Sequence, residues 1–388
     1  MRILHTADWH AGRSLHGTDL TPDIGHALDS LVEAAREHEV DAVLVAGDLF
    51  DSPTPSAAAE SVVYRTLDAL AKTAPVAVIA GNHDSPDRIN ALRPMMRRAN
   101  IYAIGLPTTP VEGGVRTLDT PNGPLQVASV PFVSHRRLVR AGHLLGLDER
   151  ERREPYLDGM MKFITSLTRK VRDSTPSALM LHGTLEGSTL SSEYAFHSTD
   201  HYTLPANALH GVTYAALGHI HAPQAVEALD PLRARYSGSV IPLDYGEAGQ
   251  ERGALLVTLD AKRVHSVEPV PLATPHPLVL EDVTLDGLEA FVSKYQDARA
   301  RVKLRLHLDA PKPGIKERLH RDLACLTVVE TVLPEYERPE PLRLDTGEVD
   351  LRDAFKRYHE DQRGRSAPAA LLAAFDEVDA ATTPREDP

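Results

Sequence analysis

Five short apolar runs, each followed at once by residues that can bind a metal ion, constrain the fold of this chain more than any other feature. The clearest run is residues 42–45, which is too short for a helix and leads into Gly47, Asp48 and Asp51. An acidic residue just beyond a buried strand lies at the carboxyl edge of the sheet, where open α/β sheets place their ligands. Asp48 is therefore a candidate metal ligand.

The same pattern occurs four more times along the chain. A lone His or Asp after a strand is usually a cap or a hydrogen-bonded polar group without further function. Five in series are hard to obtain by chance, and we expect their strand ends to converge on one edge. The runs 2–5, 76–79, 178–181 and 214–217 lead into these residues: Asp8 and His10; Asn82, His83 and Asp84; His182; His219 and His221.

The motifs at these strand ends carry a resemblance to a known family. D-x-H, G-D-x-x-D, G-N-H-D, H-G and G-H-x-H, in this order, resemble the calcineurin-like metallophosphoesterase superfamily over residues 1 to about 250. Residues 3–13, Leu15-His16-Gly17 and the overall length are similar to the SbcD family of nuclease subunits, bacterial relatives of the double-strand-break repair nuclease. Residues 18–23 depart from that family because they lack the basic residue expected there.

Length and composition set further bounds. A chain of 388 residues predicts two domains with an appendage, and 42% hydrophobic residues is typical of a globular protein. No run approaches the eighteen or so apolar residues of a membrane span, and we expect no leader before the first strand. Cys325 is the only cysteine, which excludes an internal disulfide framework and a cysteine-based zinc site. We expect a cytoplasmic protein without membrane contact.

The net charge of −13 at first argues against a nucleic-acid substrate, because phosphate contacts need Lys and Arg. Local basic clusters nevertheless occur, and each is interpreted either as a solvated face or as a DNA contact. Charge alone does not decide the substrate. The clusters are Arg93, Arg97 and Arg98; Arg136, Arg137 and Arg140; and Arg299, Arg301, Lys303 and Arg305, of which Arg93, Arg97, Arg301, Lys303 and Arg305 are our candidate DNA contacts.

The order of elements predicts an α/β protein in three parts. Strands and helices alternate over residues 1–271, and the resemblance implies a four-layer αββα sandwich that forms the nuclease domain. Residues 272–333 predict a β-α-β-α-β domain, which in the family caps the nuclease and helps to seat DNA; a purely structural domain is the alternative. Helices near 56–73 and after Ser85-Pro86 pair protomers in the family, although they could equally cover the sheet.

Residues 334–388 predict a Pro- and Glu-rich linker followed by two short amphipathic helices at 349–358 and 369–375. Short isolated helices are marginal in water and gain stability by docking their apolar faces into a groove. The resemblance implies that the partner is the coiled coil of SbcC, an SMC-like ABC ATPase, within a heterotetramer; docking onto their own domain is the alternative. The apolar residues are Leu351, Phe355, Tyr358, Leu371, Leu372 and Phe375.

The resemblance also implies a catalytic centre of two divalent metal ions. Two such ions can clamp the attacking and leaving oxygens of an in-line displacement at phosphorus. Mixed imidazole, carboxylate and amide ligands suit manganese, iron or zinc better than magnesium, and the resemblance favours manganese. One ion would be held by Asp8, His10, Asp48 and His221, and the other by Asp48, Asn82, His182 and His219.

His83 follows a predicted ligand directly, and we expect it to lie near the metals without binding them. Its implied role is to stabilise developing charge on phosphorus or to protonate the leaving oxygen; a structural histidine is the alternative. Asp84 and Asp51 are expected to orient histidines and water from a second layer.

The resulting hypothesis is a metal-dependent DNA nuclease. It would act as a 3′ to 5′ exonuclease on double-stranded ends and as an endonuclease on single strands and hairpins, in DNA repair, recombination and replication. A small-molecule phosphodiesterase or phosphatase of the same superfamily is one alternative, although it would have little use for the capping domain and terminal helices. A noncatalytic DNA-end scaffold is the other, although every ligand position holds a competent residue.

Overall fold

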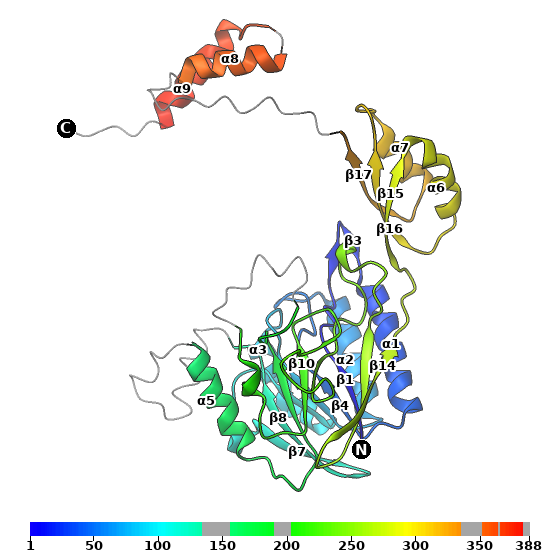
Figure 1. Cartoon of the computed structure of the whole chain (residues 1–388), viewed down its shortest axis with the longest axis vertical. Coiled ribbons are helices and arrows are strands. Elements are labelled where there is room, and N and C mark those ends of the chain that lie inside the picture. The colour runs from blue at the N-terminus through cyan, green and yellow to red at the C-terminus, as the bar shows by residue number, and fades with distance from the viewer. Residues whose placement is uncertain (134–155, 190–202, 335–350, 364, 383–388) are drawn as a thin grey trace, which may run out of the picture. The chain divides into compact units, whose positions relative to one another are not determined.

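The computed structural model describes residues 1–133, 156–189, 203–334, 351–363 and 365–382 (Figure 1). The chain divides into two compact units, residues 1–332 and residues 333–388, and each is described by itself. Of the predicted linker, residues 335–350 lie outside the described residues.

A first mixed sheet of six strands has the order β14-β13-β1-β4-β5-β6. Strands β1, β4, β5 and β6 are parallel, whereas β13 and β14 are antiparallel to their neighbours. The runs at 42–45 and 76–79 are continuously apolar because both faces of the parallel strands are buried. The strands are β1 (Arg2–Thr6), β4 (Ala42–Val45), β5 (Val76–Ile79), β6 (Ile101–Ile104), β13 (Gly253–Leu259) and β14 (Val264–Pro271).

A second mixed sheet of six strands has the order β11-β12-β10-β9-β8-β7. The strands from β12 to β8 are parallel, and the edge strands β11 and β7 are antiparallel to their neighbours. The strands are β7 (Val115–Thr120), β8 (Gly123–Val130), β9 (Ser177–His182), β10 (Tyr214–Gly218), β11 (Gln224–Ala225) and β12 (Ala234–Tyr236).

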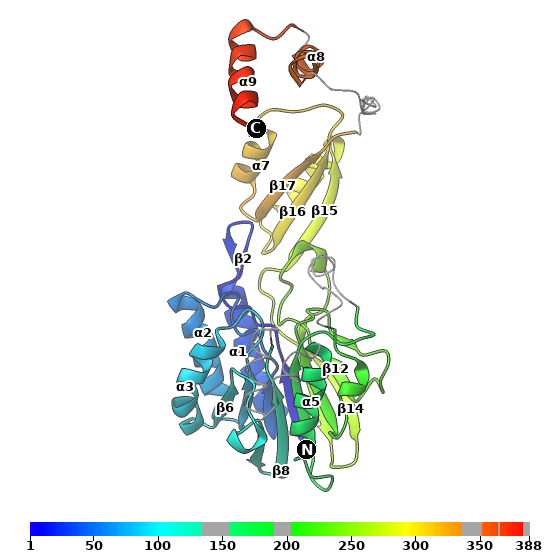
Figure 2. The ribbon, with the colours of Figure 1, turned by 90° about the vertical axis from the view of Figure 1, so that its left-hand side faces the viewer.

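The two sheets pack face to face between layers of helices (Figure 2). Ile3, Leu44 and Ile79 of the first sheet share one apolar core with Val127 and Met180 of the second. Separate cores join the first sheet to α1, α2 and α3, and the second sheet to α5. The expected α/β architecture is therefore observed. The helices are α1 (Thr21–Glu37), α2 (Ala57–Ala71), α3 (Pro86–Arg98) and α5 (Tyr156–Thr168), and the 3-10 turns are η1 (Pro110–Glu112), η5 (Ala206–Ala208) and η6 (Tyr245–Glu247).

Local chemistry explains where the helices begin. Ser56 and Ser85 each accept a backbone N–H at the start of α2 and α3, and Pro86 occupies the first turn of α3, where no N–H is needed. The sequence did not predict β7 or β14. Both are edge strands, and β14 contains two prolines that only an edge position tolerates. A short hairpin of β2 (Ser14–Leu15) and β3 (Thr18–Asp19) precedes α1.

Residues 278–332 form a small three-stranded sheet with two helices, in the predicted β-α-β-α-β order. Its three strands are parallel in the order β15-β16-β17, and Val302, Leu304 and Leu306 of the central strand pack against α6 and α7. The elements are β15 (Leu278–Thr284), η7 (Leu285–Gly287), α6 (Leu288–Tyr295), β16 (Arg301–His307), α7 (Ile315–Asp322) and β17 (Leu326–Val332).

The second unit contains α8 (Leu351–Arg363) and α9 (Ala369–Thr382), which pack against each other. The rings of Phe355 and Phe375 stack at 4.5 Å, and Arg352 forms an ion pair with Asp376 at 2.8 Å. Tyr358 is 63% exposed, so part of the predicted apolar surface is open and part is used between the two helices. Among the described helices, none is long and apolar enough to cross a membrane.

Candidate metal centre

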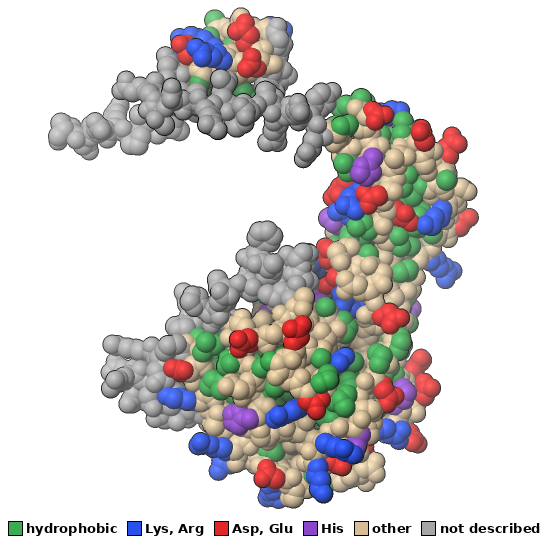
Figure 3. Space-filling model, viewed as in Figure 1, with side chains coloured by type: hydrophobic (Ala, Val, Ile, Leu, Met, Phe, Trp, Pro, Cys, Tyr) green, Lys and Arg blue, Asp and Glu red, His purple; other side chains and the backbone are tan. Residues whose placement is uncertain are grey.

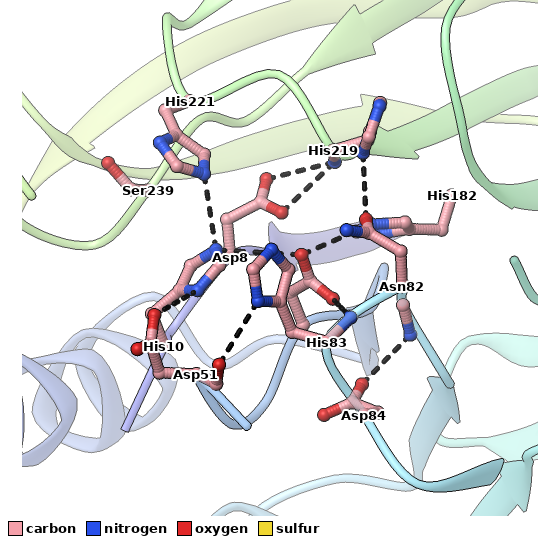
Figure 4. A network of polar contacts seen from close by, with 12 residues as sticks. Asp8, His10, Asp51, Asn82, His83, Asp84, His182, His219, His221 and Ser239 are labelled. Atoms are coloured by element: carbon pink, nitrogen blue, oxygen red, sulfur yellow. Dashed lines mark hydrogen bonds and ion pairs between the residues drawn. The ribbon is translucent and has the colours of Figure 1, made fainter. Parts of the chain in front are cut away.

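The side chains that follow five strand ends meet in one cluster (Figure 4). Strands β1, β4 and β5 of the first sheet and β9 and β10 of the second deliver them. All seven residues predicted as metal ligands take part in it, and their role as ligands stays a prediction. The cluster comprises Asp8, His10, Asp48, Asn82, His182, His219 and His221.

The backbone of the cluster is held in conformations that ordinary residues avoid. Asp8, His10 and Asp48 have φ angles of 53°, 48° and 50°. Such left-handed residues cost roughly 1–3 kcal/mol each and concentrate at functional sites. Glycines make room beside them: a Cβ on Gly47 would collide with the His182 ring, and one on Gly81 with the Asp48 carboxylate. Glycine is therefore required at both positions for steric reasons.

His10 and His221 face each other in a way that fits a bound cation. Nδ1 of His10 lies 3.2 Å from the carboxylate of Asp51, and Nδ1 of His221 lies 3.2 Å from that of Glu247. With each Nδ1–H donating to its carboxylate, a neutral ring presents the lone pair of its Nε2 atom to the cluster. These two Nε2 atoms are 3.1 Å apart, with a carboxylate oxygen of Asp8 close by. Two nitrogen lone pairs this close repel each other unless a metal ion or a proton lies between them.

A second set of atoms that could bind a metal ion surrounds His182. Its Nδ1–H donates to the carbonyl of Ala46 at 2.8 Å, which directs Nε2 into the cluster. Nε2 lies 2.9 Å from Oδ1 of Asn82 and 3.4 Å from Oδ2 of Asp48. Nδ1 of His219 is also 2.9 Å from Oδ1 of Asn82. Imidazole, amide and carboxylate donors in one group match the preferences of a transition-metal ion.

Asp48 lies between the two sets. Its Oδ1 accepts the backbone N–H of His83 at 2.9 Å. Its Oδ2 is buried without a hydrogen-bond partner and lies 3.5 Å from Nε2 of His10 and 3.4 Å from Nε2 of His182. A buried carboxylate oxygen without a partner is costly. A cation on either side would satisfy it, so the residues present fit a pair of metal ions.

The pKa values in the cluster follow from burial and opposing charges. Burial alone would raise the pKa of Asp48, but His182, His10 and His83 outweigh it and lower the pKa. Burial likewise works to lower the pKa of His182, and Asp48 overrides it and raises the pKa to about 9. For His219 burial dominates and lowers the pKa to about 3. The cluster thus favours an ionised Asp48 beside positive charge.

His83 and Asp51 lie at the more open side of the cluster. His83 is half-buried, and its ring lies 4.9 Å from that of His10. Its Nδ1 is 3.1 Å from the carbonyl oxygen of Asp51, and a ring nitrogen is near enough to His10 and Asp48 to share an ion with them. Asp51 contacts His10 as expected of a residue that orients a histidine.

Asp84 does not have the surroundings that we expected. Among the described residues its buried carboxylate hydrogen-bonds no histidine, and it accepts the backbone N–H groups of Gly81, Leu49 and Phe50 at 2.8, 3.3 and 3.0 Å. Burial and the nearby Asp48 charge raise its pKa to about 7. Asp84 ties together the loops after β4 and β5, which carry Asp48 and Asn82.

Glu247 is the residue of the site that the sequence reasoning missed. It is buried in η6 and contacts His221, while its other oxygen accepts the N–H of Leu243 at 2.9 Å and lies 3.3 Å from Arg252. Arg252 also donates to the carbonyl of His221 at 2.6 Å. No motif or strand end marks Glu247, which is 26 residues from His221 in sequence. Only the folded chain reveals the contact.

Replacing Glu247 by glutamine should weaken manganese binding about 10- to 100-fold, because such partners orient metal-binding histidines and raise their basicity. Isothermal titration calorimetry of the metal-free protein with manganese measures this directly. Glu251→Gln, an exposed change four residues along the chain, is the matched control. Equal affinities of the two variants would show that Glu247 does not position His221.

The candidate DNA contacts lie apart from this cluster. Arg93 and Arg97 project from α3 and line a pocket beside β6. The cations of β16 are paired within the chain: Arg301 with Asp23, Lys303 with Glu330, and Arg305 with Asp282. On the face seen in Figure 3, Lys and Arg are interspersed with Asp and Glu. The predicted cluster at Arg136, Arg137 and Arg140 lies outside the described residues.

The sequence of the chain is similar to those of known proteins. The family model of the calcineurin-like phosphoesterases matches residues 1–223. The D subunit of the SbcCD nuclease of Bacillus subtilis is 30% identical over 95% of both chains. The proteins of the same description from Escherichia coli K12 and Rhodobacter capsulatus are 28% and 30% identical, over 89% and 92% of this chain and 87% and 94% of their own.

Proposed function

The chain belongs to the calcineurin-like phosphoesterase family, and from its homology to SbcD nuclease subunits we propose that it is a two-metal DNA nuclease. The proposed activities are 3′ to 5′ exonuclease on double-stranded ends and endonuclease on single strands and hairpins, with manganese as the metal. The observation that carries the proposal is the buried Asp48 carboxylate between two sets of converging donors.

The proposed chemistry divides the work among residues of this chain. Two divalent cations, when bound, supply an activated water and polarise the phosphodiester. Asp48 lies near both His10 and His182, so its carboxylate would help to hold both cations. Asp51 and Glu247 hold His10 and His221 in one tautomer. The side chains therefore meet the substrate already oriented, with little rearrangement needed during reaction.

His83 is proposed to deliver a proton to the leaving oxygen. Its Nδ1 lies against the Asp51 carbonyl, and a ring nitrogen reaches the edge of the cluster beside His10 and Asp48. A half-buried imidazole at that position can exchange protons with solvent between turnovers. Asp84, whose carboxylate accepts the amides of two loops, is assigned a supporting role.

We also propose that residues 1–271 are the nuclease domain, residues 272–333 a capping domain that helps to seat DNA, and residues 334–388 the attachment for an SbcC-type ATPase. The relatives are named as one component of the SbcCD nuclease, which supports a complex with that ATPase. A homodimer through α2 and α3, with two ATPase chains completing a heterotetramer, is part of the proposal. Met95 on α3 is 70% exposed, and an apolar side chain so exposed supports a contact with a second protomer there.

The terminal helices offer a direct test of the attachment. Tyr358→Asp combined with Leu371→Asp should weaken binding to the ATPase coiled coil at least about tenfold, because both side chains are exposed and apolar and would meet the partner's groove as charges. Co-purification and titration of the two proteins measure it. Arg357→Asp on α8 adds a similar charge at an exposed position and should have a smaller effect; equal losses would count against docking through the apolar residues.

The activity itself is tested by giving the purified protein a linear duplex, a DNA hairpin and bis(p-nitrophenyl) phosphate with manganese, with and without the ATPase. The proposal expects both DNA substrates to be cut. Turnover of the small ester with DNA intact, even with the ATPase present, would favour a small-molecule phosphodiesterase. Binding of DNA ends without any hydrolysis would favour a noncatalytic scaffold.

A further inference from the structure

A pocket of about 280 Å³ opens beside β6, the edge strand of the first sheet. Apolar residues that line it include Ile101, Ala103 and Val127. Arg93 and Arg97 of α3 and Arg116 of β7 line it as well. The pocket contains none of the residues of the metal centre, and nothing in the proposed nuclease mechanism uses it.

Two of these arginines converge on one point. Nη2 of Arg93 and Nη2 of Arg116 lie 3.4 and 3.5 Å from the place where a side chain on Gly113 would begin. Gly113 has a φ of +108° and carries no Cβ, which leaves that point open. The guanidinium of Arg116 lies over the ring of Tyr102 at 5.4 Å, a contact that fixes its position.

The positive charge of the pocket is only partly balanced, because three arginines and a single acid, Glu112, line it. Among the described residues, none of the three arginines forms an ion pair, unlike the cations of β16. Glu112 is the nearby acid, but its carboxylate accepts a hydrogen bond from Thr109 at 2.7 Å, and Arg93 reaches only its backbone carbonyl, at 3.5 Å. Burial first, and then Arg116 and Arg97, lower the pKa of Arg93, and the smaller opposing effect of Glu112 does not offset them. An anion in the pocket would relieve this repulsion.

The shape and chemistry of the pocket narrow the choice of anion. A guanidinium group binds the oxygens of a phosphate or a carboxylate with two parallel hydrogen bonds. The apolar residues that line the pocket beside the arginines suit the sugar and base of a nucleotide rather than a bare inorganic ion. We propose that this pocket binds a nucleotide through its terminal phosphate monoester. The source is either a free mononucleotide or the 5′-phosphorylated end of a DNA strand.

Calorimetric titration of the full chain with deoxyadenosine monophosphate in EDTA tests the proposal, because chelation removes phosphate binding by metals. The nucleotide should bind more tightly than inorganic phosphate, and deoxyadenosine should bind least. Arg116→Ala and Arg97→Ala should each weaken binding about tenfold or more, the loss typical of a charged hydrogen bond. Arg97 is exposed, so its replacement should not disturb folding.

Arg98→Ala is the matched control, since Arg98 follows Arg97 on α3, is exposed and does not line the pocket. No binding in EDTA, equal affinity for inorganic phosphate, or an equal loss in the Arg98 variant would each overturn the proposal. Titration with short single strands that carry or lack a 5′ phosphate identifies the source. Tighter binding of the phosphorylated strand that is lost in Arg116→Ala indicates a DNA end. Equal affinities of the two strands, together with binding of the mononucleotide, indicate the free nucleotide. Binding in EDTA is independent of hydrolysis, so this result and a failure of the nuclease proposal are distinguishable.

Discussion

Replacing Asp48 by asparagine should lower manganese-dependent DNA cleavage by more than about 100-fold. Removal of a residue that only supports a metal ligand costs up to about 100-fold, and loss of a ligand itself should cost more. Asparagine keeps the shape of the side chain and removes its charge. Oδ2 of Asp48 is the buried oxygen that lies 3.5 Å from His10 and 3.4 Å from His182, so one change affects both sets of donors. Initial rates on a labelled duplex measure the effect.

A thermal measurement separates loss of metal binding from loss of folding. Manganese that binds only the folded chain should raise the melting temperature of the native protein by mass action, and Asp48→Asn should remove most of that increase. Asp87→Asn, an exposed acid in the first turn of α3, should keep both activity and the metal-induced shift. Cleavage by Asp48→Asn within a few-fold of the native rate would exclude Asp48 as a shared ligand.

The second large effect is expected at His83. Its replacement by alanine should lower DNA cleavage about 10²- to 10⁴-fold, the range for loss of a general acid. Bis(p-nitrophenyl) phosphate should lose far less, because p-nitrophenolate leaves without being protonated. Both rates are measured on the same preparation, and the loss of DNA cleavage should greatly exceed the loss of ester hydrolysis.

Controls for His83 come from the same molecule. His210→Ala, an exposed histidine outside the cluster, should retain both activities. Asp84→Asn should reduce cleavage less than His83→Ala, since Asp84 is held by loop amides. Equal losses on DNA and on the activated ester would show that His83 binds metal, as its distance to His10 and Asp48 also allows, rather than donating a proton.

Much of the site could be predicted because its residues follow strand ends. A parallel strand fixes where its carboxyl end lies, so a short apolar run followed by Asp or His locates that side chain in space. Asp8, Asp48 and His182 were accessible in this way. Glu247 was not, since it lies in a loop turn that the packing of β13 and η6 brings against His221.

The remaining differences have a common physical cause in tertiary contacts. Arg301 resembles a DNA contact in sequence, but the buried Asp23 of α1 binds it at 2.7 Å and also accepts from His276. The edge strands β7 and β14 have weak apolar patterns because one side of each faces solvent. The ion pair of Arg301 and the edge positions of β7 and β14 both depend on how distant segments pack, which local sequence patterns do not contain.

Anomalous diffraction from crystals grown with manganese tests the two-metal centre most directly. We predict two anomalous peaks, one beside His10 and His221 and the other beside His182 and Asn82, with the Asp48 carboxylate between them. A single peak on one side of Asp48, or peaks only elsewhere in the chain, would contradict the account.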